Sequence, residues 1–123
     1  MAAFPTGTLY VTNGFIPEVL EYIDRAGRSP FRKWFDRLDP QAAAKVSTAL
    51  NRIALGNLSS AKGVGASVFE FRLDFGPGYR IYFGKYGHEI VVLLAGGTKR
   101  RQRRNIEAAV VRWTDYKRRK EGT

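Results

Sequence analysis

The chain of 123 residues contains no cysteine and a single histidine. Without cysteine it can form no disulfide, no thiolate nucleophile and no cysteine-built zinc site. With one histidine, His88, which we interpret as a turn residue, it cannot use a pair of histidines to cleave RNA. Its few acidic residues show no ligand spacing, and we expect no metal and no cofactor.

Long apolar runs are absent as well. No stretch approaches the ~20 apolar residues that a membrane span needs, and the first residues lack the basic start and apolar run of a signal peptide. We therefore expect no contact with membranes and a location in the reducing cytoplasm.

Acidic residues are few beside the basic ones. The chain has 21 Lys and Arg against 11 Asp and Glu, a net charge of +10. For a small domain this favours a polyanionic partner, although a solvated basic surface is the plainer alternative. With 44% hydrophobic residues, the chain can form one modest core, so we expect a single domain over residues 17–123. Residues 1–16 are interpreted as a flexible leader or an extra strand.

Two start signals predict two consecutive helices. Ser29-Pro30 and Asp39-Pro40 each combine an N-cap residue with proline at the first helical position. After each of these starts, apolar residues recur three and four positions apart. In the second predicted helix this apolar stripe ends at Gly56. Because hardly any loop separates the helices, we expect them to form a helical hairpin.

The hydrophobic period changes from 3.6 to two after a predicted loop at residues 56–67. In residues 68–75, phenylalanines and a leucine alternate with Glu70, Arg72 and Asp74. Such alternation predicts a strand with one face in the core and the other in solvent.

The remaining elements complete an α+β fold. A basic C-terminal helix begins after about Lys99, and we expect it and the helical hairpin to pack on a small, mainly antiparallel β-sheet. Three further strands are predicted: an edge strand at residues 18–23, a strand at 79–83 that follows the GPG turn of 76–78, and an apolar central strand at 89–97.

A series of short motifs runs through the chain in a fixed order. Together they resemble the addiction-module killer group within the RelE/ParE/HigB superfamily of type II toxins, over about residues 18 to 116. The motifs are WFDRL at 34–38, the GN helix exit at 56–57, KGVG at 62–65, EFR at 70–72, GPGYRIYF at 76–83 and LLAGGTK at 93–99.

The resemblance implies a RelE-like toxin domain held inactive by a cognate antitoxin, of a DNA-binding helix-turn-helix type encoded nearby. RelE-like members cut messenger RNA in the ribosomal A site without metal, whereas ParE-like members share the fold and poison DNA gyrase. We expect a ribosome-dependent, metal-independent mRNA endonuclease. The alternatives are a gyrase inhibitor and a decayed toxin that binds RNA or antitoxin without cutting, since Thr98 and Asn105 replace residues that are commonly Asp in the group.

Metal-free cleavage needs a base, cations around the phosphate and an acid at the leaving oxygen. From the residues alone, we expect Glu70 to act as the base. By similarity to RelE-type toxins, Arg72 corresponds to a catalytic basic residue, Arg80 to the phosphate-binding arginine, and Lys99 to a basic residue near the scissile phosphate. The alternative is a solvated face on which Glu70 pairs with both arginines for only ~0–1 kcal/mol.

Other residues are candidates for RNA binding. Tyr82 could stack on a base or donate a proton, or it could simply pack in the sheet. The basic run of the C-terminal segment could neutralise phosphates or receive an acidic antitoxin. The basic candidates are Lys62, expected in a loop, and Arg100, Arg101, Arg103 and Arg104.

The two kinds of candidate residue predict different effects of substitution. We expect Trp34→Ala or Phe71→Ala to destabilise the fold by ~3–5 kcal/mol. In contrast, Arg72→Ala or Arg80→Ala should spare folding and remove activity.

Overall fold

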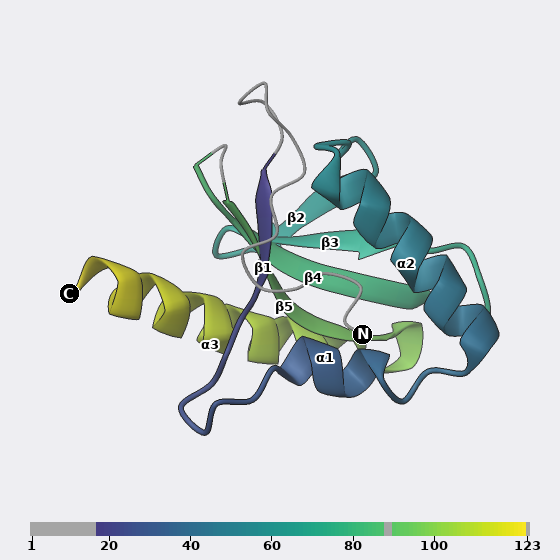
Figure 1. Cartoon of the computed structure of the whole chain (residues 1–123), viewed down its shortest axis with the longest axis horizontal. Helices are drawn as coiled ribbons and strands as arrows, with labels where there is room; N and C mark the ends of the chain where they lie inside the picture. The colour runs from purple at the N-terminus through teal and green to yellow at the C-terminus, as the bar shows by residue number, and fades with distance from the viewer. Residues whose placement is uncertain (1–16, 88–89, 123) are drawn as a thin grey trace.

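The computed structural model describes residues 17–87 and 90–122. The expectations for residues 1–16 and for His88 fall outside this range. Figure 1 shows the elements in chain order: β1 (Glu18–Glu21), α1 (Pro30–Phe35), α2 (Pro40–Ala54), β2 (Ala61–Gly65), β3 (Val68–Arg72), β4 (Tyr79–Tyr86), β5 (Ile90–Thr98), the 3-10 turn η1 (Lys99–Arg101) and α3 (Gln102–Glu121).

Within the described residues, the strands form one five-stranded sheet in the order β1-β5-β4-β3-β2. Only β1 and β5 run parallel, and the other neighbours are antiparallel. The predicted α+β class, the mainly antiparallel sheet and the edge position of β1 are confirmed. The loop predicted at residues 56–67 is wrong in part, because β2 lies within it. Its two glycines, Gly63 and Gly65, break the alternation that identifies a strand.

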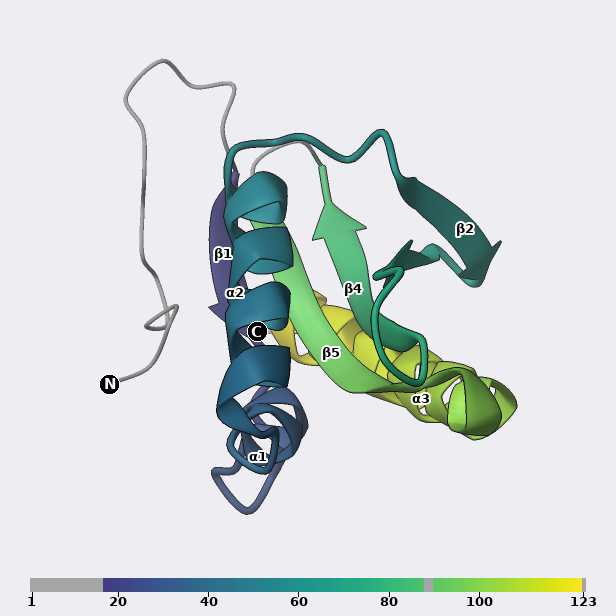
Figure 2. The ribbon, with the colours of Figure 1, turned by 90° about the vertical axis from the view of Figure 1, so that its right-hand side faces the viewer.

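Both predicted helix starts are present. The Ser29 hydroxyl accepts a hydrogen bond from the Arg32 N–H at 3.0 Å, and the Asp39 carboxylate accepts one from the Ala42 N–H at 2.8 Å. The helical hairpin is not confirmed. In Figure 2, α1 is seen nearly end-on at the foot of α2, so the two helices are not side by side.

The sheet carries a core on each face, and Figure 2 shows α2 and α3 on opposite sides of it. The α2 face holds the apolar cluster built on Phe31, Leu50, Phe71 and Phe83, among others. The α3 face holds a second cluster: Tyr22, Val68, Tyr82, Val92, Leu94, Ala95, Ala109 and Trp113. The molecule therefore has three layers, with the sheet in the middle.

The second core overturns the expectation that one face of β3 lies in solvent. Val68 and Glu70 are fully buried, and of the alternating residues only Arg72 and Asp74 are exposed. The indole of Trp113 lies against Gly84 so closely that a Cβ there would overlap it. Glycine on β4 therefore lets α3 approach the sheet and cover the face that the alternation alone left open.

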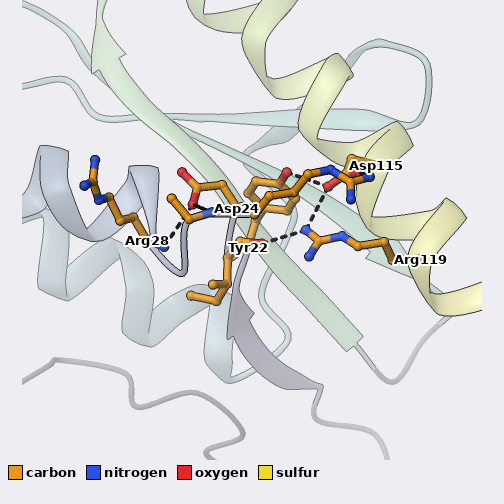
Figure 3. Close-up of polar contacts among 8 residues, drawn as sticks. Tyr22, Asp24, Arg28, Asp115 and Arg119 are labelled. Carbon is orange, nitrogen blue, oxygen red and sulfur yellow. Dashed lines mark hydrogen bonds and ion pairs between the residues drawn. The ribbon is translucent and has the colours of Figure 1, made fainter.

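A polar cluster fixes the far end of α3 to the chain that leaves β1 (Figure 3). The Tyr22 hydroxyl donates to Asp115 at 2.6 Å, and Arg119 contacts Asp115 at 2.8 Å and the Ile23 carbonyl at 2.6 Å. Burial, and then the neighbouring Asp115, raises the pKa of Tyr22. The hydrogen bond from Tyr22 lowers the pKa of Asp115. The cluster thus holds α3 over the sheet face that contains Glu70.

Candidate functional site

A cleft of about 580 Å³ opens where β3 ends, β4 begins and β5 passes into η1. We call it the turn cleft. The strand register explains it, since Arg72 lies opposite Arg80, and Arg80 lies opposite Gly97, two residues before Lys99. Its lining residues are Arg72, Leu73, Asp74, Phe75, Gly76, Pro77, Gly78, Arg80 and Lys99. The structure therefore brings together three of the four predicted catalytic residues.

The GPG turn shapes this cleft. Gly76 and Gly78 have φ values of +56° and +77°, which favour glycine. A Cβ on Gly78 would lie 3.1 Å from Arg80 Nη1 and 3.3 Å from Lys99 Cβ. Because Gly78 has no side chain, the two cationic residues can lie against the turn from both sides.

Arg80 is held in place on the floor of the turn cleft. Its side chain is 5% exposed, Nη1 donates to the Gly78 carbonyl at 2.8 Å, and Nε lies 3.4 Å from Glu70 Oε2. Arg72, which is exposed, is its direct cross-strand neighbour. Like charges at such positions destabilise a sheet. A bound anion would relieve this repulsion.

Glu70 lies behind Arg80, not on the surface of the turn cleft. Its carboxylate is fully buried and accepts hydrogen bonds from the Tyr82 hydroxyl at 3.0 Å and from Gln102 Nε2 at 2.8 Å. It is not among the residues that line the cleft. Because a ribose hydroxyl could not reach a buried carboxylate, the premise on which Glu70 was expected to act as a base is wrong. The expected Glu70–Arg80 ion pair is present, but buried rather than solvated.

Tyr82 is fully buried in the α3-side core. Burial, reinforced by the charge of Glu70 and the hydrogen bond to it, strongly raises its pKa. The packing alternative is thus the one that the structure shows, and no base could stack on this ring while α3 is in place. The burial of Arg80 likewise corrects the expectation that Arg80→Ala spares folding, since the variant would leave the buried Glu70 with only the exposed Lys62 as a cationic neighbour.

The remaining predicted RNA-binding residues are exposed. Lys62 lies on strand β2 rather than in a loop, with 58% of its side chain exposed and Nζ 3.9 Å from Glu70 Oε1. The four arginines follow Lys99 along η1 and the first turn of α3. With Glu107 they line a cleft of about 480 Å³: Arg100, Arg101, Arg103 and Arg104.

No family model matches the chain. A Haemophilus influenzae protein, described only as uncharacterized, is 36% identical over 80 residues, which cover 64% of this chain and 81% of that protein. The chain belongs to the family of this Haemophilus protein. The description of this relative names no activity.

This member of the Haemophilus protein's family has a third basic cleft, which the sequence analysis missed. It measures about 400 Å³ and lies between α2 and the end of β3, with Lys45, Arg52 and Arg72 around it. Lys45 and Arg52 are seven residues apart, which places them on one helix face. The sequence shows this spacing, but it does not show that this face of α2 lies next to the end of β3.

Across residues 17–87 and 90–122, no group of three or more His, Cys, Asp or Glu side chains could hold a metal ion. No helix in the described ranges is long and apolar enough to cross a membrane.

Proposed function

We propose that this protein is the toxin of a type II toxin-antitoxin module, with a RelE-like fold in which α1 and α2 are the N-terminal helical pair. We propose further that it is a metal-independent mRNA endonuclease. The observation that supports the activity best is the turn cleft, where cationic side chains from β3, β4 and η1 surround one opening.

The chemistry follows from these cations. A phosphodiester attacked by its own 2′-hydroxyl gains negative charge on the equatorial oxygens in the transition state. Arg72 and Arg80 present planar guanidinium groups that suit two phosphate oxygens, and Lys99 adds a mobile ammonium. Groups already oriented toward the developing charge stabilise it without reorganising, which is the usual source of the largest catalytic effect.

Proton transfers can be assigned within the same cleft. Among its lining residues, Asp74 is the only acid, and we assign it as the acceptor of the 2′-hydroxyl proton. The 2′-oxygen then forms a bond to phosphorus while the bond to the 5′-oxygen breaks, and Lys99 donates a proton to that oxygen. The products are a 2′,3′-cyclic phosphate and a free 5′-hydroxyl.

Glu70 acts through Arg80 in this scheme. Its buried carboxylate attracts Arg80 Nε, which lies 3.4 Å from Glu70 Oε2. On the other side of the guanidinium, Arg80 Nη1 donates a hydrogen bond to the Gly78 carbonyl. Both contacts fix the direction of the remaining nitrogen. We therefore propose Glu70 as a positioning residue rather than as the base.

The basic surface fits the proposed partners. Exposed arginines of η1 and α3 would contact ribosomal RNA and mRNA, and an acidic segment of a cognate helix-turn-helix antitoxin would cover the same charge. Both partners would meet the protein in the cytoplasm.

Primer extension on a reporter mRNA, with and without programmed ribosomes, tests the activity. We compare the wild type with Arg72→Ala and Lys99→Ala, because both residues are exposed and both variants should fold. Lys33→Ala on α1 is the matched control. Cuts at A-site codons that need ribosomes and fall by about 10²–10³-fold in the cleft variants, but not in the control, are expected.

Three other outcomes of this experiment would change or contradict the proposal. Cuts on naked RNA would keep the nuclease and discard the ribosome. Equal cutting by wild type and both cleft variants would remove the turn cleft from the mechanism. No cuts in either reaction would contradict the proposal and direct the work to a DNA gyrase supercoiling assay, or to a decayed toxin.

A further inference from the structure

The basic cleft between α2 and the end of β3, which we call the helix cleft, is built on one face of α2. Its lining residues on that helix are Lys45, Thr48, Ala49 and Arg52, which share this face. Ala49 is buried, so the face rests on the sheet, while Lys45 and Arg52 at its rim are exposed. Seven residues of α-helix separate the two cations by about 10 Å along the axis.

The helix cleft and the turn cleft lie on either side of one short segment. Residues 72–75 line both of them. Figure 1 shows α2 beside the end of β3, at the same end of the sheet as the passage from β5 into η1. A chain that leaves the turn cleft across residues 72–75 would therefore enter the helix cleft directly.

The charge of the helix cleft is one-sided. Lys45, Arg52 and Arg72 face one carboxylate, that of Asp74, and Thr48 and Ser60 add hydroxyl groups. Lys45 Nζ lies 5.3 Å from the centre of the Phe75 ring, an interaction that is weak at an exposed site. The lysine can therefore exchange this ring for a phosphate with little loss of stability.

Phe75 distinguishes the ligands that these charges could attract. Its ring contributes to both clefts and stacks on Tyr79 with the ring centres 6.2 Å apart. Single-stranded nucleic acids bind on surfaces that combine cations for the backbone with aromatic rings for the bases. An acidic peptide would use the cations and has no comparable need of the ring.

We propose that the helix cleft is a second phosphate-binding subsite for single-stranded RNA, in which Lys45 and Arg52 bind the backbone next to the nucleotide held in the turn cleft, and Phe75 supports a base between them. The inference rests on the proposed function in one respect, namely that the strand in question is the one cleaved in the turn cleft.

Binding is measured by fluorescence anisotropy with a labelled 2′-O-methyl RNA, which cannot be cleaved, of about eight nucleotides, a usual site size. The variant is Lys45→Ala/Arg52→Ala. The control is Lys33→Ala/Arg118→Ala, which removes the same charge from exposed positions of α1 and α3 outside both clefts. Each protein is titrated over a range of salt concentrations. Thermal melting confirms that all of them fold.

The expected result has three parts. The slope of log affinity against log salt becomes shallower in the variant by about 0.7 for each phosphate that the protein no longer neutralises, and stays at the wild-type value in the control. A dinucleotide with one phosphate, which fills only the turn cleft, binds variant and wild type equally. Phe75→Leu weakens binding of the oligonucleotide but leaves binding of a polyglutamate peptide unchanged.

Three results would overturn the inference. One is an equal change of slope in variant and control, which would mean that net charge alone matters. Another is a polyglutamate peptide that matches the oligonucleotide in affinity and is weakened equally in the variant. The third is a wild type that binds no oligonucleotide. Because cleavage is not part of this assay, ribosome-dependent cutting would survive each of these results, and loss of cutting would leave a positive binding result intact.

Discussion

The buried pair of Glu70 and Arg80 gives the sharpest test of the structure. Glu70 is fully buried. Its carboxylate accepts hydrogen bonds from Tyr82 and Gln102 and forms an ion pair with Arg80. Glu70→Ala would leave the Arg80 cation without a counter-charge and the Tyr82 hydroxyl without its acceptor. Removing one partner of a buried ion pair destabilises a protein by about 3–5 kcal/mol. A solvated pair, as the sequence alone allowed, would contribute only ~0–1 kcal/mol.

Urea unfolding followed by tryptophan fluorescence separates these two values. With a denaturant slope of about 2 kcal/mol per M, a loss of 3–5 kcal/mol lowers the midpoint by roughly 2 M. Glu107→Ala, at an exposed position of α3, is the control and should stay within about 0.5 kcal/mol of wild type. The double variant Glu70→Ala/Arg80→Ala should lose less than the sum of the single losses, because the uncompensated charge disappears with its partner.

The reasoning is refuted if Glu70→Ala unfolds at the same urea concentration as the Glu107 control. It would equally fail if the two single losses added without any coupling. Either result would mean that Glu70 is hydrated in solution, and the role of a positioning residue for Arg80 would have to be given up.

Three further predictions concern stability. Trp113→Ala removes the largest fully buried side chain from the α3-side core and should lower the free energy of unfolding by about 3–5 kcal/mol in a urea titration, against little change for the exposed Val111→Ala. Gly84→Ala forces a Cβ into the Trp113 indole and should destabilise by about 1–3 kcal/mol, whereas Gly63→Ala, whose Cβ would come no nearer than 4.0 Å to Phe69, should not. The pKa values of Asp115 and Asp24 are lowered in the folded state, mainly by the Tyr22 hydroxyl and the Arg28 backbone N–H, so both carboxylates bind protons less readily when folded. Their contribution is present above the unfolded pKa of about 3.9 and is lost as the pH falls through the lower folded value. The urea midpoint should therefore drop below about pH 4, and Asp115→Asn should start lower at pH 7 and show a flatter decline.

The amino-acid sequence by itself determined the local structure. Ser29 and Asp39 cap helices because their side chains reach N–H groups only three residues away. The alternation in residues 68–75 identified β3, and Gly76 and Gly78 supply the positive φ values of the turn. Each of these signals acts over a few residues, which is why each could be read without knowing the fold.

The sheet order and the second core were decided by tertiary structure. The sequence predicted a basic C-terminal helix packed on the sheet, but nothing local says which surface of the sheet that helix will cover. Once Trp113 packs over Gly84, the polar side of β3 becomes interior and Glu70 changes from a surface acid to the buried partner of Arg80. The same packing explains why Glu70, expected on a solvated face, is buried, while Arg72, Arg80 and Lys99 line one cleft.

The composition of the helix cleft was also decided by tertiary structure. Lys45 and Arg52 lie on one helix face by their spacing alone, yet only the packing of α2 on the sheet brings them next to Arg72 and Phe75. Local propensity and pattern are short-range properties of the chain. A binding surface joins residues that are distant in sequence, so its composition depends on burial and packing that no short stretch specifies.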